Sequence, residues 1–366
     1  MPKLNYLKKK ESIFLKNLSF LSEFYLILGF LSVGLDFEMI LIIVFKTYLY
    51  FLYNCFKEIK ADVINKLNFL KMKKIVLSMI TILTIGFYAV AQDLSPYFKV
   101  GESTETIDVL SGKIVSVLEK NGFTILGNYN PSEKATLKIV AFTRTDIKEK
   151  VVKVKDRGAL AAVFKIGLEK SAGKVIISYT NPEYLLRAYL MNNYELYRNT
   201  FIKFSEDLKN TLLAFGDEFV PFGGSVKADK LKKYHYKIMM PYFTDPIELA
   251  TYDSFEQGLI KIQNNLSINK GATKMVYKLV YKEEKVAVFG IALKSKEEGE
   301  AYFLPKIGES NIAAMPYEII LQDNVVTMLH GKYRIALFWP DLSMGTFMKI
   351  MSTPGDIKDA LKAVCN

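Results

Sequence analysis

Few side chains in this sequence could support nucleophilic catalysis or bind a metal. It contains two histidines, His235 and His330, and two cysteines, Cys55 and Cys365. A Ser-His-Asp triad needs a histidine in the site, and a zinc site needs several Cys, His or carboxylate ligands. We interpret both histidines as structural and Cys365 as part of a frayed C-terminus. There is no Gly-rich phosphate loop and no G-x-S-x-G motif, and we expect no cofactor.

The best candidate for a binding site is a turn from a strand into a helix that occurs in both halves of the chain. A helix start offers free backbone N–H groups to an anion, and aromatic side chains can wall a pocket. The competing interpretation is structural, because Asn and Pro begin helices, acids favour the helix dipole, and aromatic rings fill small cores. The candidate ligand-binding residues are Tyr179, Asn181, Glu183, Tyr184, Trp339 and Asp341.

The first candidate turn lies within an alternation of helical and extended patterns. Apolar residues at helical spacing follow Ser103 or Thr104, while β-rich runs flank a turn at residues 170–173. The pattern predicts a helix that ends at Asn121-Gly122, followed by strands that begin at residues 123 and 135. A hairpin is predicted over residues 159–180. After it, the pattern predicts a helix with Asn181 as its N-cap and Pro182 as its first residue, and a helical stretch over residues 194–215.

The second half repeats this alternation. Asp253 or Ser254 can cap its first helix, and Glu283-Glu284 can form a hairpin turn. The pattern predicts a helix over residues 253–271, a hairpin over 273–295, strands over 313–324 and 331–340, and terminal helices over 343–364.

The two halves also match in order. Ala161, Gly173, Lys174, Tyr179, Pro182 and Glu183 align by eye with Ala313, Gly331, Lys332, Phe338, Pro340 and Asp341. The turn-rich stretch between the halves breaks all periodicity. We therefore predict an α+β protein of two similar domains, each an antiparallel sheet with helices packed on it. The first spans residues 92–220, a linker spans 221–235, and the second spans 236–366.

The first half resembles the bacterial domain of unknown function family 302. The resemblance rests on the sequence KNGF at residues 120–123 and on SYTNPEYL at residues 178–185. The second half departs from the family pattern, with FWPDL at residues 338–342. The resemblance implies a compact α+β domain with an antiparallel sheet. It implies no activity, because the family brings no agreed catalytic residues.

An export signal is expected inside the chain. Met72, Lys73 and Lys74 are followed by an uncharged apolar run over residues 75–88 and by a small-x-small site at 89–91. These are the three parts of a secretory signal peptide, and the run is short for a membrane span. We expect a signal peptide over residues 72–91, cleaved after Ala91, and hence a periplasmic or secreted protein.

The stretch before this signal has an unusual composition. Phe, Tyr, Leu, Ile, Lys and Asn supply 50 of residues 1–71, and AT-rich codons encode these six residue types. We interpret residues 1–71 as a hydrophobic extension from a misassigned start. The alternative is a protein anchored in the membrane by its N-terminal region, since residues 39–56 could span a thin bilayer.

The charge of the chain does not favour nucleic acid as a partner. Its net charge is +11. Residues 1–91 contribute twelve Lys and six acidic residues, so the rest carries a net charge of only +5. A nucleic-acid-binding protein needs a basic stripe or face. We expect no nucleic-acid partner, and contact with a membrane only through the N-terminal segment.

Together these features predict an exported, non-catalytic module that binds a small molecule or an envelope protein. An enzyme that uses carboxylates and tyrosines stays open, because such a site has no signature in a single sequence. A membrane-anchored envelope protein is the third hypothesis.

Overall fold

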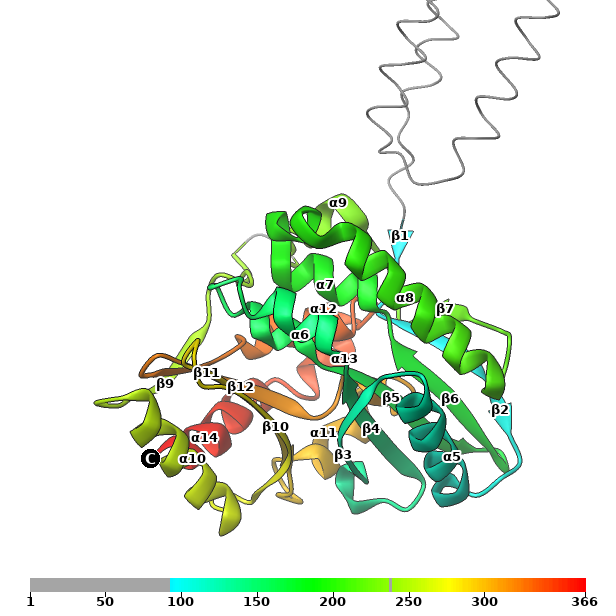
Figure 1. Ribbon diagram of the computed structural model, residues 1–366. Coiled ribbons are helices and arrows are strands. Elements are labelled where there is room, and N and C mark those ends of the chain that lie inside the picture. Colours follow the sequence, from blue (N-terminus) through cyan, green and yellow to red (C-terminus); the bar gives the residue numbers. More distant parts are fainter. Residues whose placement is uncertain (1–92, 237–238) are drawn as a thin grey trace, which may run out of the picture. The chain divides into compact units, whose positions relative to one another are not determined.

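The computed structural model describes residues 93–236 and 239–366, which belong to a compact unit spanning Val90–Asn366. The predicted extension 1–71 and signal peptide 72–91 lie outside the described residues. Within the described ranges, no helix has both the length and the apolar character that a membrane span requires. The fold is α+β, with two antiparallel sheets of six and five strands and helices packed on them (Figure 1).

The six-stranded sheet has the order β3-β4-β5-β6-β2-β7, and all its neighbouring strands are antiparallel. Its strands are β2 (Tyr97–Ser103), β3 (Thr124–Tyr129), β4 (Leu137–Thr143), β5 (Phe164–Ser171), β6 (Lys174–Thr180) and β7 (Val220–Phe222). Helix α5 packs on β3, β4 and β5, with the side chains of Leu110, Ile114 and Leu118 buried along one face. The helices of this region are α5 (Ile107–Lys120), α6 (Thr145–Val151), α7 (Pro182–Leu190) and α8 (Arg198–Leu212).

The five-stranded sheet has the order β10-β11-β12-β13-β9, again with antiparallel neighbours. Its strands are β9 (Ile247–Thr251), β10 (Thr273–Tyr281), β11 (Val286–Leu293), β12 (Tyr317–Gln322) and β13 (Val325–Met328). Helices α10 and α14 pack on it (Figure 1). The helices of this region are α10 (Phe255–Ser267), α11 (Glu300–Ile307), α12 (Gly331–Phe338), α13 (Met344–Met348) and α14 (Thr353–Cys365).

The two sheets place their strands in the same order. In the six-stranded sheet, β3, β4, β5 and β6 lie side by side, and β2 pairs with β6. In the five-stranded sheet, β10, β11, β12 and β13 lie side by side, and β9 pairs with β13. The register also shifts at a similar place, between Ile125 and Gly127 in β3 and between Met275 and Tyr277 in β10. These two edge strands meet, and a Cβ atom at Gly127 would overlap the carbonyl oxygen of Val276.

Several predicted elements are confirmed. Helix α5 ends at Asn121, and Ser254 caps α10. Asn181 caps α7, with Pro182 as its first residue. The predicted hairpins are β5-β6 and β10-β11.

The strand predicted over residues 331–340 is wrong, because residues Gly331–Phe338 form helix α12. The strand that follows β12 is instead β13, and the turn between them lies at Asp323-Asn324. Six consecutive residues of α12, Tyr333 to Phe338, are buried. A short helix in which six consecutive residues are buried shows no clear amphipathic period, so its sequence resembles a buried strand. Gly331 therefore begins a helix, whereas Gly173, its proposed counterpart, lies in a hairpin turn.

The stretch predicted as a linker carries short regular elements. It contains most of β7, then β8 (Val226–Lys227) and α9 (Ala228–Leu231), and β8 pairs with β1 (Asp93–Leu94). Gly223 and Gly224 both have a φ of 84°, a conformation that favours glycine. The boundaries of the two predicted domains stay a prediction.

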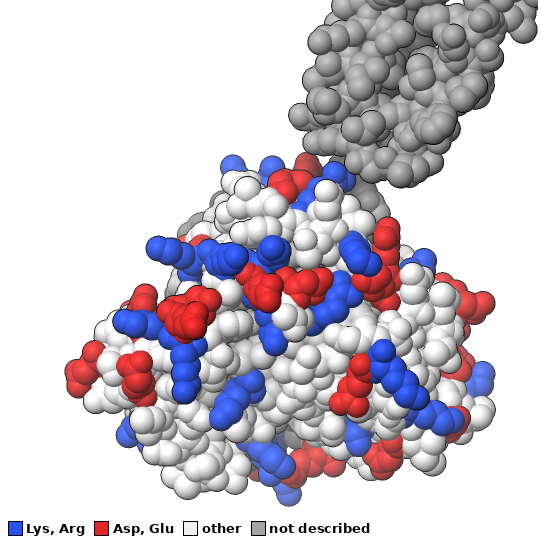
Figure 2. All heavy atoms as spheres, viewed as in Figure 1, with Lys and Arg blue, Asp and Glu red and all other residues white. Residues whose placement is uncertain are grey.

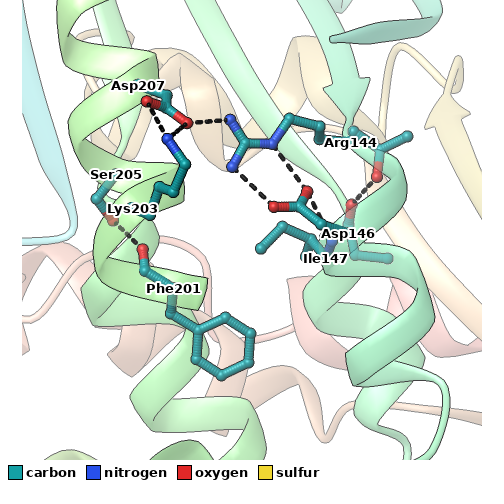
Figure 3. Close-up of polar contacts among 9 residues, drawn as sticks. Arg144, Asp146, Ile147, Phe201, Lys203, Ser205 and Asp207 are labelled. Carbon is teal, nitrogen blue, oxygen red and sulfur yellow. Dashed lines mark hydrogen bonds and ion pairs between the residues drawn. The ribbon is translucent and has the colours of Figure 1, made fainter. Parts of the chain in front are cut away.

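A network of charged groups fastens α8 to the start of α6. Arg144 donates to both carboxylate oxygens of Asp146 at 2.8 Å and to Asp207 at 2.8 Å, as Figure 3 shows. Its guanidinium also lies over the rings of Phe123 and Phe204, 5.3 and 4.9 Å from their centroids. Planar guanidinium groups favour this combination of bidentate pairing and stacking.

Candidate functional site

At the start of α7, the predicted binding residues make local contacts. The side chain of Asn181 accepts from the backbone N–H of Glu183 at 3.1 Å and donates to the carbonyl of Ser95 at 2.8 Å. The carboxylate of Glu183 pairs with Arg187 at 2.9 Å. Tyr179 is buried in β6. These contacts cap the helix and hold the N-terminal segment against it.

The other predicted residue of α7, Tyr184, reaches the far end of α12. Its hydroxyl donates to the carbonyl oxygen of Leu337 at 2.8 Å. Tyr97 and Tyr234 donate in the same way to Phe338 and Ala336, each at 2.9 Å. The last carbonyls of a helix have no partner within it, so three tyrosines supply the missing donors. The C-terminal end of α12 is thereby held in place.

This end of α12 carries the two predicted residues of the second half. Trp339 is the C-cap of the helix and is buried, while Asp341 is exposed in the following turn. Neither lies at a strand-to-helix turn, contrary to the prediction, because α12 replaces the predicted strand. The hydroxyl of Tyr184 contacts the backbone of Leu337, two residues before Trp339. Of the six predicted residues, Trp339 lines the pocket described next.

An apolar pocket of about 220 Å³ lies beside α12 and α13. One wall is a single face of α12, because residues spaced by three, four and seven positions share a helix face. The opposite walls come from α13 and from the segment between α9 and β9. The lining residues are Tyr236, Met240, Lys332, Ile335, Ala336, Trp339, Leu342, Met344 and Phe347.

Two methionines line this pocket, and three exposed methionines lie near them in the sequence. Met240 and Met344 line it, and Met344 is 52% exposed. Met239, next to the lining residue, is 97% exposed, and Met348 and Met351 follow Met344 at spacings of four and three residues. Methionine is flexible and polarisable, and it is common at surfaces that accept varied apolar partners. These methionines are not among the binding residues predicted from the sequence, although they cluster at residues 239–240 and 344–351.

Trp339 is the only tryptophan of the chain. Its side chain is 2% exposed, and its ring packs edge-on against Phe338 with centroids 6.5 Å apart. Within the part of the chain that the structure describes, its indole Nε1 has no hydrogen-bond partner. A buried indole N–H usually has a partner, which makes this wall of the pocket unusual.

A second hollow lies at the C-terminal end of α7. Two adjoining pockets of about 270 and 320 Å³ share Met191, Asn192 and Lys232. Met191 has a φ of 51° and a ψ of −121°, a strained conformation for a residue other than glycine. The lining is mixed, with Tyr234, Phe243, Arg187 and Glu195 among its residues.

A cluster of buried charges lies between the sheets. Lys165 of β5 and Glu318 of β12 form an ion pair, with side chains 3% and 7% exposed. Arg334 pairs with the other oxygen of Glu318 at 3.4 Å, and the hydroxyl of Tyr277 donates to Glu318 at 3.2 Å. Burial lowers the pKa of Lys165, against the attraction of Glu318. These groups face one another and do not line the pockets described above.

One buried carboxylate connects the two regions. Glu300 of α11 accepts from the Tyr129 hydroxyl and the Ser132 N–H at 3.0 Å and from the Leu293 N–H at 3.2 Å. Burial raises the pKa of Glu300 to about 7, although these three donors oppose the increase. A raised pKa is common in catalytic acids. Here, however, both oxygens are occupied by protein donors.

The remaining candidates for chemistry are packed or serve as caps. His330 caps α12, since its Nδ1 accepts from the Lys332 N–H at 3.2 Å. Cys365 is buried at the end of α14, where burial raises the thiol pKa to about 12. The prediction that Cys365 belongs to a frayed C-terminus is therefore wrong. No group of three or more His, Cys, Asp or Glu that could hold a metal occurs among the described residues.

The sequence matches no family model, and a search of curated proteins finds no match.

Proposed function

We propose that this protein is a non-catalytic binding module that holds an apolar small molecule in the pocket beside Trp339. The observation that carries the proposal is the lining of this pocket, in which aromatic and aliphatic side chains and methionines predominate. Ligand sites are commonly concave and mostly apolar, with a few polar groups that orient the ligand. In this pocket, the polar groups are Lys332 and Tyr236.

The rival function is an enzyme that uses carboxylates and tyrosines. A catalytic site of that kind needs such groups to converge on a space that a substrate can enter. Glu300 and Glu318 are the carboxylates that lie beside tyrosines in the buried interior, and their oxygens accept from protein donors. The lining of the Trp339 pocket contains no carboxylate, and in the second hollow Glu195 pairs with Arg187 and Arg198. Binding is therefore the better-supported function.

The duplicated architecture is part of the proposal. The shared strand order of the two sheets supports two similar domains. The residue match proposed for the second half places Gly331 to Phe338 on a strand, whereas these residues form helix α12. We retain domains at residues 92–220 and 236–366 and the relation to domain family 302 as proposals. Export through a signal peptide cleaved after Ala91 is likewise a proposal, with a membrane-anchored form as its alternative.

The partner is proposed to be a small molecule rather than nucleic acid. On the face shown in Figure 2, Lys and Arg side chains alternate with Asp and Glu side chains. Nucleic-acid binding relies on a continuous basic surface. The pattern in Figure 2 does not favour it.

The single tryptophan makes the proposal directly testable. We expect 1-decanol, used as an uncharged apolar probe, to shift the emission of Trp339 in a saturable titration of the full chain. Isothermal calorimetry should give the same affinity. Met344→Gln should weaken binding about tenfold, because a lining apolar contact is replaced by an amide.

The matched control is Met275→Gln, which changes a methionine of β10 that is 38% exposed. This variant should bind 1-decanol like the original protein. If neither emission nor heat responds to any n-alkanol from hexanol to dodecanol, the proposed function is wrong.

A further inference from the structure

We infer that the ligand of the Trp339 pocket is an amphiphilic anion, whose apolar tail lies against Trp339 and whose acidic headgroup pairs with Lys332. The inference rests on the proposed function and specifies its ligand class. It depends on the way α12 arranges a cation and an apolar surface along one face.

Lys332 and Trp339 occupy opposite ends of the pocket wall. Lys332 lies in the first turn of α12, and Trp339 caps its end. Between them, Ile335 and Ala336 complete the same face. Seven residues of α-helix advance by about 10 Å, so the wall is long enough for a short alkyl chain. A ligand that lies along it meets an ammonium at one end and an indole at the other.

The ammonium of Lys332 is available to a ligand. The side chain is exposed, and in the described ranges its Nζ has neither an ion-pair partner nor a hydrogen-bond partner. The neighbouring imidazole of His330 is engaged with the backbone N–H of Lys332. The pocket lining offers no other charged group. An acidic headgroup at this rim therefore meets a cation that the protein itself does not neutralise.

The other end of the pocket favours the same orientation. Asp341 is exposed two residues after Trp339. A carboxylate there repels an anionic headgroup, whereas the flexible apolar side chains of Met344 and Phe347 can pack on a tail. Charge thus directs the head toward the start of α12 and the tail toward its end.

The two parts of the ligand should contribute differently to affinity. Each methylene that enters the pocket should tighten binding about fourfold, until the pocket is full. The headgroup pair is at an exposed rim, where an ion pair changes affinity by about twofold to fivefold. The tail therefore sets the affinity, and Lys332 selects the sign of the headgroup.

The test compares dodecanoate, 1-dodecanol and dodecylammonium by Trp339 emission and calorimetry on the full chain. The two ions are kept below their critical micelle concentrations, and 1-dodecanol is kept below its solubility limit. Lys332→Gln should weaken dodecanoate binding about twofold to fivefold and leave 1-dodecanol unchanged. Lys332→Arg should retain dodecanoate binding. Lys261→Gln, on an exposed position of α10, is the matched control and should change neither ligand.

The outcomes separate the inference from the function on which it rests. The anionic ligand class is wrong if Lys332→Gln leaves dodecanoate binding unchanged, or if dodecylammonium binds as tightly as dodecanoate. If 1-dodecanol still binds in either case, the apolar pocket remains supported. Failure of all three probes to bind removes the proposed function itself. Selective weakening of dodecanoate by sodium chloride would further support the pair with Lys332.

Discussion

Lys165 and Glu318 form a buried ion pair from matching places in the two sheets. Each is the second residue of its strand, and β5 and β12 occupy the third place in the order of their sheets. The opposing strands pair them with Ala141 and Gly290, and the ring of Tyr277, whose hydroxyl donates to Glu318, lies over Gly290. Two positions that correspond in the strand order therefore carry opposite charges and meet.

The free energy of unfolding should fall by different amounts when Glu318 and Lys165 are replaced one at a time. Glu318→Gln leaves the Lys165 ammonium and the Arg334 guanidinium without their carboxylate, and should lower the free energy of unfolding by about 3–5 kcal/mol. Lys165→Met leaves Glu318 with Arg334 and Tyr277, and should have the smaller effect. Urea unfolding measures both, and equal losses would contradict this assignment.

Single substitutions in the exposed pair Lys174–Glu102 serve as the control. Their side chains are 57% and 33% exposed. Each should change the free energy of unfolding by less than about 1 kcal/mol.

Glu300 should make stability depend on pH. Its pKa rises from 4.5 to about 7 in the folded protein, so the folded state favours the protonated acid. The stabilisation is complete below about pH 4.5 and is lost as the pH rises through about 7, with a total of about 3 kcal/mol. In Glu300→Gln, urea unfolding at pH 5 and pH 8 should show that the pH-dependent part of the free energy of unfolding contributed by Glu300 is lost. Glu256→Gln, at an exposed position in α10, should retain it.

The contribution of the hydrogen bond from Tyr184 to α12 can be measured by removing the Tyr184 hydroxyl and following the free energy of unfolding. Tyr184→Phe leaves the buried carbonyl of Leu337 without its donor, which should cost about 1–2 kcal/mol. The emission of Trp339 should shift, because this carbonyl lies two residues before it. Tyr179→Phe is the matched control, since the Tyr179 hydroxyl makes no hydrogen bond within the described residues. An equal effect of both variants would contradict this role.

Arg144 should stabilise the junction of α6 and α8 through its shape as well as its charge. Arg144→Lys keeps the charge but loses the bidentate pair with Asp146, and should cost about 1–3 kcal/mol. Asp207→Asn should cost less than about 1 kcal/mol, because the Asp207 side chain is 34% exposed and Asp146 still holds Arg144. Thermal unfolding of the two variants tests this order of effects.

Much of the secondary structure could be predicted because its signals are local. The apolar spacing of α5, the Asn121 end, the Asn181-Pro182 start of α7 and the hairpin turns depend on neighbours within a few residues. A two-sheet α+β fold follows from such elements. The candidate residue Trp339 was found in the same way, as an aromatic residue beside a turn, although its predicted setting was incorrect.

Helix α12 shows where local reasoning fails. Its residues from Tyr333 to Phe338 are buried because the surrounding chain covers them, and three tyrosines and Asn311 from distant segments donate to the carbonyls at its end. Neither fact has a periodic signal. The predicted binding residues of α7 have types that suit a binding site, whereas their polar atoms form helix caps, hydrogen bonds and ion pairs within the protein.

The sequence by itself therefore determined most helices and hairpins, since backbone propensity, caps and apolar spacing are encoded within single segments. Only the tertiary structure decided that residues 331–338 are helical, that Lys165 meets Glu318 across 153 positions, and that Met240, Lys332 and Met344 enclose one pocket with Trp339. These relations depend on how distant segments pack, and packing is a property of the whole chain.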